Sequence, residues 1–288
     1  MKRAIDAVAS SSGEFLLKKA KASHAKLASG AGFDNTLHHI IAEPTTFDLK
    51  NEIKPPALTK PIKKSPGLDL VLYKPFIPRP TSTKLFNYLL EALPWHRVQY
   101  ATRGRDITTP RFTTVFGCDE TGAPLDTYFR RPRALPPILT ALTDLVERQT
   151  NAHYNFVLLN YYADGDHSIS YHSDDEAFLG PNPIIASLSL GGARDFLMKH
   201  KTESARKEKF VLDDGDLLLM RGETQTQWLH SIPKRAKASP RINLTFRKAI
   251  NTKATNNYYR YNVGDGGIWR WMDGKMVHVG KTDEKASD

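Results

Sequence analysis

Two potential metal ligands stand one residue apart in the segment 155–176, which reads NFVLLNYYADGDHSISYHSDDE. On a strand, His172 and Asp174 would point to the same side, because side chains two positions apart share a face. A third potential ligand, His230, follows 56 positions after Asp174. Two imidazoles and one carboxylate on one face of a metal ion leave coordination positions open, as in the facial triad of non-haem Fe(II) oxygenases. Other divalent metals fit these ligands too, whereas a closed zinc site usually needs four protein ligands.

The segment 241–247, RINLTFR, alternates polar and apolar side chains. On a strand its polar residues would share one face, and they are Arg241, Asn243, Thr245 and Arg247. Two arginines that face the interior of a two-sheet structure are costly unless an anion accompanies them. The planar guanidinium matches a carboxylate through two parallel hydrogen bonds, so a buried dicarboxylate ligand would offset this cost. In the alternative arrangement the apolar face points inward and the polar face is solvated.

Asn160 and Tyr162 repeat this alternation on the run that leads into His172 and Asp174. They are expected to share one strand face and could donate or accept further hydrogen bonds at the same ligand. Both residue types are also ordinary in strands, so by themselves they indicate little.

The elements that must position these residues are short strands preceded by two helices. Apolar spacing predicts helices over 81–93 and 136–149, and alternating residues predict early strands at 68–73 and 95–100. After residue 154 the chain becomes rich in strand-forming runs, namely 155–162, 168–172, 184–190, 194–200, 208–213, 216–220, 228–232 and 241–247. This order favours an α+β protein, either a two-sheet β-sandwich or a jelly roll, with two N-terminal helices packed outside it. The polar stretch 103–127 is interpreted as a long functional loop region with short strands.

Composition divides the chain into three parts. Residues 1–66 are poor in apolar side chains and carry 11 lysines and arginines against 6 acidic residues, so a basic disordered tail is expected. Residues 67–250 are predicted to form the folded domain. Residues 251–288 form a C-terminal extension in which Trp269, Trp271 and Val277 could dock as a small hairpin.

The whole chain of 288 residues carries a formal net charge of +10, which suits a polyanionic partner such as nucleic acid. A basic tail that only increases solubility is the alternative. The single cysteine, Cys118, excludes an intrachain disulfide and favours a reducing compartment. No apolar run is long enough for a membrane span and no secretory signal is seen, so no membrane partner is expected. The run 60–64, KPIKK, is either a nuclear-import patch or solvated charge.

Taken together, these segments resemble the AlkB family of Fe(II)- and 2-oxoglutarate-dependent nucleic-acid dioxygenases, and most of all its eukaryotic DNA and RNA repair members. The resemblance covers roughly residues 68–250 and depends on these motifs: Asn160-x-Tyr162, HSDDE at 172–176, PIIASLSLG at 183–191, Arg194-Asp195-Phe196, Gly215-Asp216-Leu217, His230 and RINLTFR. HSDDE and RINLTFR at this separation are far more specific than a lone pair of ligands.

The resemblance implies a double-stranded β-helix, and it assigns roles to the candidate residues. His172, Asp174 and His230 would hold Fe(II), and Arg241 would bind the distal carboxylate of 2-oxoglutarate. The rest of the cosubstrate pocket would consist of Asn160, Tyr162, Asn243, Thr245 and Arg247. Asp175 would contact the damaged base, and three further residues, Trp95, Arg111 and Tyr128, fall where relatives have base-stacking and lid residues.

The implied activity is oxidative demethylation, with O2, of bases such as 1-methyladenine and 3-methylcytosine in DNA and in RNA. The methylated base would be flipped out or already single-stranded, and a monomeric, nuclear enzyme, with cytoplasm as a second location, is expected. Three alternatives stay open at this point: an RNA-modification demethylase, a protein hydroxylase with the same iron chemistry, and a non-catalytic nucleic-acid-binding module.

Overall fold

The protein is seen in a computed structural model that describes residues 47–102, 104–117, 134–250 and 268–279. The chain divides into two units, 1–38 and 39–288. All of the described residues belong to the second unit, and the fold below is the fold of that unit.

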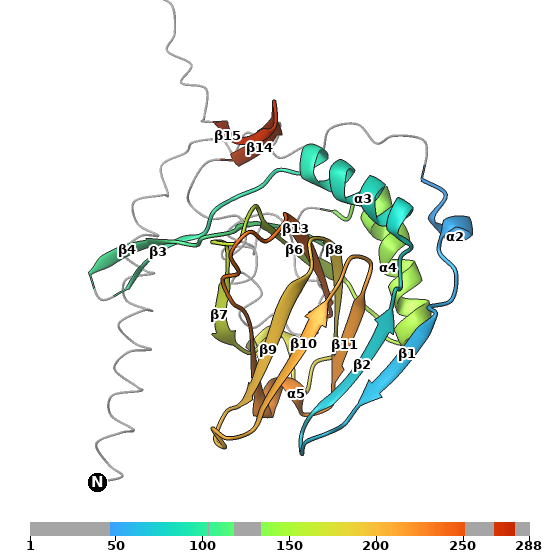
Figure 1. The fold of residues 1–288 in the computed structure, drawn as a ribbon, viewed down its shortest axis with the longest axis vertical. Coiled ribbons are helices and arrows are strands. Elements are labelled where there is room, and N and C mark those ends of the chain that lie inside the picture. The colour runs from blue at the N-terminus through green and yellow to red at the C-terminus, as the bar shows by residue number, and fades with distance from the viewer. Residues whose placement is uncertain (1–46, 103, 118–133, 251–267, 280–288) are drawn as a thin grey trace, which may run out of the picture. The chain divides into compact units, whose positions relative to one another are not determined.

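Two antiparallel sheets face each other in a jelly roll (Figure 1). The main sheet has seven strands in the order β1 (Leu58–Ile62), β2 (Asp69–Lys74), β11 (Leu217–Arg221), β8 (Ile185–Gly191), β13 (Arg241–Arg247), β6 (Phe156–Tyr162) and β5 (Phe112–Gly117). The smaller sheet has the order β10 (Lys207–Leu212), β9 (Arg194–His200), β12 (Trp228–Ile232) and β7 (Ile169–His172). All eight strands predicted from residue 155 onward are thereby confirmed, each to within one residue at either end.

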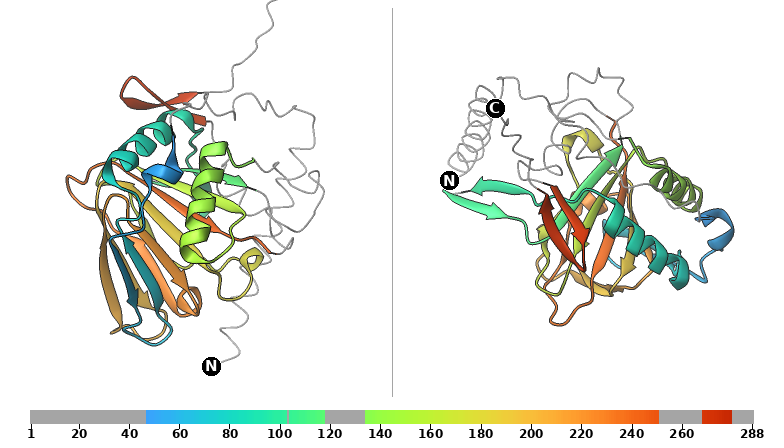
Figure 2. Two further views of the ribbon diagram at one scale, coloured as in Figure 1. Left: turned by 90° about the vertical axis from the view of Figure 1, so that its right-hand side faces the viewer. Right: turned by 90° about the horizontal axis from the view of Figure 1, so that it is seen from above.

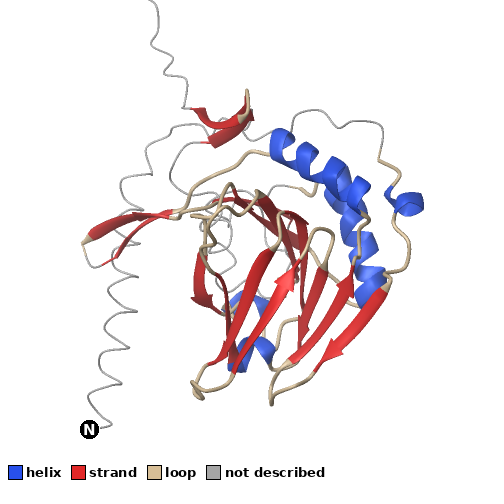
Figure 3. Ribbon diagram, viewed as in Figure 1, coloured by secondary structure: helices blue, strands red, loops and turns tan. Residues whose placement is uncertain are grey.

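The predicted helices are confirmed as α3 (Arg79–Ala92) and α4 (Pro137–Thr150), and both lie on the outer face of the main sheet (Figure 2, left). Prolines stand in the first turn of each helix. A proline has no amide hydrogen to donate, but amides in the first turn have no acceptor within the helix, so no hydrogen bond is lost. The buried side chains of α3 and α4 share one core cluster with side chains of the main sheet. Figure 3 shows the strands of both sheets in red and the helices in blue. The short helices are α2 (Leu49–Glu52), α5 (Thr224–Gln227) and the 3-10 helix Ala177–Leu179.

Strand β13 lies near the middle of the main sheet, and all seven of its residues are buried. Its apolar side chains, Ile242, Leu244 and Phe246, belong to the core cluster beneath the two helices. Its polar side chains therefore face the smaller sheet, because successive side chains of a strand alternate between faces. This arrangement excludes the alternative in which the polar face of RINLTFR is solvated.

The C-terminal extension does form the predicted hairpin, made of β14 (Ile268–Met272) and β15 (Lys275–Val279). The backbones of Trp269 and Trp95 exchange two hydrogen bonds, of 3.0 and 2.6 Å. The ring of Trp269 also packs on Phe112 of β5, with the ring centroids 5.4 Å apart. The hairpin thus covers the junction between the end of α3 and the edge of the main sheet.

Three expectations from the sequence need correction. The sheet begins before residue 67, because β1 pairs along its whole length with β2. The expected strand 95–100 is not continuous, because Trp95 and His96 form only isolated bridges and regular pairing begins at Gln99. The region 103–127 contains the short strands that were expected, with β4 (Arg105–Thr108) paired to β3 (Gln99–Thr102), but β5 is an edge strand of the main sheet with all six residues buried and not part of a loop. Residues 118–127 lie outside the described residues.

The central position of β13 leads to a stability prediction. Leu244 is 0% exposed in the core cluster, so Leu244→Ala should lower the free energy of unfolding by about 2–5 kcal/mol through lost packing and a residual cavity. The matched control is Leu58→Ala on edge strand β1, where the side chain is 48% exposed and the expected change is within about 0.5 kcal/mol. Urea unfolding measures both values, and equal losses would contradict the assigned core.

Candidate metal centre and cosubstrate pocket

The three predicted metal ligands lie together between the two sheets. His172 at the end of β7 stands directly opposite His230 on β12, so the two imidazoles project from the same face of the smaller sheet. Their ring centroids are 4.2 Å apart. Asp174 follows two residues after His172, and one ligand atom from each of the three residues lies within 4.8 Å of the others.

The donor atoms suit a divalent metal ion. Nδ1 of His172 lies 2.9 Å from the Ser170 carbonyl oxygen, which can only accept, so Nδ1 carries the proton and Nε2 keeps its lone pair. Nε2 of His172 and Nε2 of His230 each lie 3.8 Å from an oxygen of Asp174. Burial lowers the pKa of His230 to about 3, so its imidazole is neutral as a metal ligand requires. The Asp174 Oδ2 atom is buried and has no hydrogen-bond partner among the described residues.

Two neighbours hold Asp174 in place. Arg247 donates a hydrogen bond of 2.8 Å from Nη2 to Asp174 Oδ1, and the Gln225 side-chain oxygen accepts one of 2.9 Å from the Asp174 amide. Burial alone would raise the pKa of Asp174, but the charge and hydrogen bond of the Arg247 guanidinium hold that pKa below its usual value. Asp174 is therefore an ionised ligand whose second oxygen points at the metal position.

A cavity of about 340 Å³ opens beside these ligands. Its lining combines the three ligands with polar residues of the main sheet, among them Asn160, Tyr162, Asn243, Thr245 and Arg247. The strand register explains this gathering, because Asn160 stands opposite Asn243 and Tyr162 opposite Arg241. Residues directly opposite on antiparallel strands share a face. The five predicted pocket residues therefore line one cavity together with the metal ligands.

Arg241 is fully buried beside this cavity. Its Nη2 donates to Ser189 Oγ at 2.9 Å and to the Asn243 side-chain oxygen, and its guanidinium carbon lies 5.5 Å from the Tyr162 ring centroid. Its Nε and Nη1 atoms have no hydrogen-bond partner within the described part of the chain. Burial lowers the pKa of Arg241 to about 10, so the side chain stays charged at neutral pH. A buried cation with spare donors needs an anion, and the carboxylate of a cosubstrate supplies one.

The residues predicted to contact substrate are placed very differently. Arg111 lines the cavity and donates a 2.8 Å hydrogen bond from Nε to Asn160 Oδ1. Asp175 instead accepts from Ser173 and Lys201 on the outside, with its side chain 54% exposed. Trp95 is 0% exposed in the core, and its indole nitrogen donates to the Leu90 carbonyl. A base cannot stack on so buried a ring, so the predicted role of Trp95 needs correction. Tyr128 lies outside the described residues.

Other cavity residues had no predicted role. Glu176 lines the cavity and accepts a 3.4 Å hydrogen bond from Arg247 Nη1, whereas Asp175 does not line it. Phe196 of β9 stacks on the His230 ring, with the centroids 5.3 Å apart and the planes at 22°. Phe196 could have been found from the sequence, because it stands two positions after Arg194 in the motif Arg194-Asp195-Phe196 and shares the inward face of that strand. Glu176 could not be separated from Asp175 without knowing where β7 ends.

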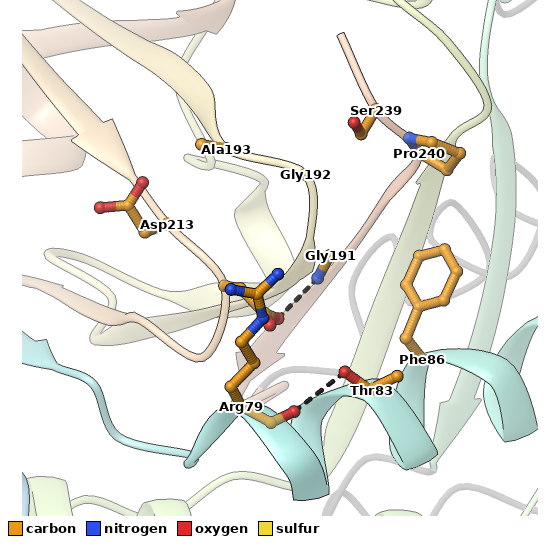
Figure 4. A pocket seen from close by; sticks show the side chains of 10 residues that line it. Arg79, Thr83, Phe86, Gly191, Gly192, Ala193, Asp213, Ser239 and Pro240 are labelled. Atoms are coloured by element: carbon orange, nitrogen blue, oxygen red, sulfur yellow. Dashed lines mark hydrogen bonds between the residues drawn. The ribbon is translucent and has the colours of Figure 1, made fainter.

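A second pocket, of about 600 Å³, lies where the start of α3 approaches the turn between β8 and β9 (Figure 4). It shares no lining residue with the cavity beside the triad. Its carboxylate Asp214 is already bound, since Oδ1 accepts from the Gly191 amide at 2.8 Å and from the Ser82 hydroxyl. Within the described residues, the group of three potential metal ligands lines the smaller cavity and not this pocket.

The triad geometry leads to a prediction about metal binding. Asp174→Ala removes the only carboxylate ligand and should weaken Mn(II) binding by more than about 100-fold, since outer-shell partners alone contribute about 10- to 100-fold. The fold should persist because Arg247 keeps Glu176 as a partner. Asp175→Ala, on the adjacent but outward-facing carboxylate, is the control and should bind normally. Calorimetric titration measures both, and near-normal binding by Asp174→Ala would refute the triad.

The buried guanidinium leads to a prediction about the cosubstrate. Arg241→Gln should weaken 2-oxoglutarate binding to the Mn(II)-loaded protein by about 2 kcal/mol or more, roughly thirtyfold, because a buried charged partner is lost. Arg221→Gln is the matched control, since Arg221 pairs with Asp69 at the end of β11 and is 39% exposed. Calorimetry under anaerobic conditions gives both affinities. An unchanged affinity for Arg241→Gln would argue against this part of the pocket.

Comparison with known proteins agrees with this site. Residues 69–247 match the 2OG-Fe(II) oxygenase superfamily. A DNA oxidative demethylase ALKBH2 from Arabidopsis thaliana is 34% identical over 218 residues, which cover 66% of this chain and 69% of that protein. The human DNA oxidative demethylase ALKBH2 is 42% identical over 130 residues, 42% of this chain and 50% of that protein.

A third relative is the human alpha-ketoglutarate-dependent dioxygenase alkB homolog 3, which is 35% identical over 192 residues. That match covers 61% of this chain and 64% of the human protein. The matched stretches thus span between half and about two thirds of these relatives. Together with the His-Asp-His group in the jelly roll, these matches show that the chain belongs to the AlkB family of Fe(II)- and 2-oxoglutarate-dependent dioxygenases.

Proposed function

We propose that the protein oxidatively demethylates N-alkylated bases, of the 1-methyladenine and 3-methylcytosine type, in DNA and also in RNA, and so reverses alkylation damage directly. The observation that carries this proposal is the ligand triad. It lies beside a cavity of about 340 Å³ that is also lined by inward-facing polar side chains of β13. The relatives named DNA oxidative demethylase support DNA as a substrate.

Bound Fe(II), 2-oxoglutarate and O2 supply an oxidant for a C–H bond of the substrate while 2-oxoglutarate is converted to succinate and CO2. The chain's own residues position the reactants. His172, Asp174 and His230 would hold the metal, and Arg241 would bind the far carboxylate of 2-oxoglutarate. The amide and hydroxyl side chains of the pocket would orient the cosubstrate by further hydrogen bonds, while Phe196 and the other apolar lining residues limit access of water.

Glu176 and Arg111 are the candidates for contacts with the methylated base. Both line the cavity, and each is held by a partner in the pocket, Arg247 for Glu176 and Asn160 for Arg111. A carboxylate can accept hydrogen bonds from the exocyclic amino group of adenine or cytosine. The base would enter flipped out or from a single strand, because a base within the stack cannot reach a buried metal.

The formal net charge of +10 supports a polyanionic substrate, whose phosphates lysines and arginines would neutralise. We further propose a monomeric enzyme that acts in the nucleus, with cytoplasm as a second location. Lysines 60, 63 and 64 support import because they are exposed on and just after β1. None of the described helices is long and apolar enough to cross a membrane.

The test is demethylation of oligonucleotides that carry one 1-methyladenine or one 3-methylcytosine, followed by mass spectrometry. Loss of one methyl group should require both Fe(II) and 2-oxoglutarate, which are omitted in turn, and Asp174→Ala should be inactive while Asp175→Ala keeps metal-dependent turnover. Single- and double-stranded DNA and RNA, and a methylated peptide, form the substrate panel. Activity confined to the peptide would overturn the proposal in favour of a protein hydroxylase, and no turnover on any member would favour a non-catalytic module.

A further inference from the structure

Arg194, the first residue of β9, is a second fully buried arginine, and it stands outside the cavity lining. Its side chain is 0% exposed, and it forms no ion pair with a carboxylate within 4.0 Å in the described ranges. Burial lowers its pKa. A cation in this position is costly unless its donors are satisfied, so its partners indicate what it stabilises.

Those partners are backbone carbonyls of two loops. Nη2 donates to the His167 carbonyl at 2.8 Å and to the Pro233 carbonyl at 2.6 Å, and Nη1 donates to the Asp164 carbonyl at 3.3 Å. Asp164 and His167 belong to the loop that joins β6 to β7, and Pro233 immediately follows β12. The two loops therefore lead into or out of the strands that carry His172 and His230.

The same guanidinium lies over the Tyr162 ring. The Arg194 guanidinium carbon lies 5.4 Å from the ring centroid, and that of Arg241 lies 5.5 Å from it. Distances below about 6 Å are typical of cation–π contacts. Tyr162 is 2% exposed, lines the cavity and stands at the last position of β6, so a ring of the pocket wall contacts two buried cations. Two cations around one ring also make this end of the pocket attractive to a dianion.

We infer that Arg194 is a positioning residue for the 2-oxoglutarate pocket, which fixes the Tyr162 ring and the two loops beside it without touching the cosubstrate. This inference rests on the 2-oxoglutarate site of the proposed function. Arg194 should support binding of the cosubstrate and not of the metal, because it contacts Tyr162 and the two loops. The metal ligand Asp174 is held by other residues, Arg247 and Gln225. Loss of Arg194 should therefore weaken 2-oxoglutarate binding much more than metal binding.

The test compares Arg194→Met and Arg194→Lys with a matched control, Arg235→Met. Arg235 lies in the loop after β12 and also donates to a backbone carbonyl, that of Ala193 at 3.1 Å, but it is exposed. Anaerobic calorimetry measures Mn(II) binding first and 2-oxoglutarate binding second, with no nucleic acid present. Arg194→Met should weaken 2-oxoglutarate binding about 10- to 100-fold, as outer-shell partners do, and Mn(II) binding by less than about threefold. Arg194→Lys should lie between this variant and the wild type, and Arg235→Met should match the wild type.

Two further measurements separate positioning from general loss of structure. Hydrogen exchange of the metal-free protein should show faster exchange in residues 163–168 and 234–236 of Arg194→Lys, with the core strands unchanged. In a cycle with Tyr162→Leu, the double variant should lose less 2-oxoglutarate affinity than the sum of the two single losses, because both changes remove the contact between Arg194 and Tyr162. If Arg194→Met does not fold, Arg194→Lys decides the question through the same ratio of affinities.

The outcomes distinguish the inference from the function on which it rests. If wild-type protein binds Mn(II) but not 2-oxoglutarate, the proposed function fails. If wild-type protein binds both and the Arg194 variants bind 2-oxoglutarate normally, or lose Mn(II) and 2-oxoglutarate equally, the role given to Arg194 is overturned.

Discussion

The structure depends on keeping positive charge inside a jelly roll. Arg241 and Arg247 project from β13, an inner strand of the main sheet, into the space between the sheets, and each is at most 5% exposed. Such charges are stable only with anionic partners or good acceptors. Arg247 has Asp174 and Glu176, while Arg241 has neutral acceptors and spare donors. The charge of Arg247 is therefore neutralised by carboxylates of the protein itself. Arg241 is left to pair with a ligand that carries a negative charge.

The ion pair of Arg247 with Asp174 links the two sheets. The pair of Arg247 with Asp174 reaches from the main sheet to the segment after β7, so the carboxylate that serves the metal is held by the strand that also forms the cosubstrate pocket. Strands β7 and β12 place the two imidazoles opposite each other on the smaller sheet. Metal and cosubstrate positions thus share one wall, and the apolar side of that wall is fixed by α3 and α4.

Much of this arrangement follows from local patterns in the sequence. Strand alternation predicts that residues 241–247 place four polar side chains on one face, and the structure agrees because helices cover the apolar face. The helices α3 and α4 are predicted by their apolar spacing and prolines. The choice between Asp175 and Glu176 could not be made in this way, because the chain leaves β7 after His172 and strand alternation no longer applies. The burial of Trp95 could not be predicted, because its ring packs on Tyr161 of β6 and its backbone pairs with Trp269, both of which are distant in the sequence. The role of Arg194 depends on carbonyls of two loops, which only a three-dimensional structure brings together.

The central claim is that the inward polar row of β13 and the His-Asp-His group bind 2-oxoglutarate and Fe(II) as one site. Anaerobic absorption spectroscopy tests it most directly, because chelation of bound Fe(II) by 2-oxoglutarate produces a charge-transfer band. The account predicts that the band develops when 2-oxoglutarate is added to the Fe(II)-loaded wild-type protein, saturates at one equivalent per chain, and is absent without either component. No band from a folded, Fe(II)-loaded protein at saturating 2-oxoglutarate would contradict it.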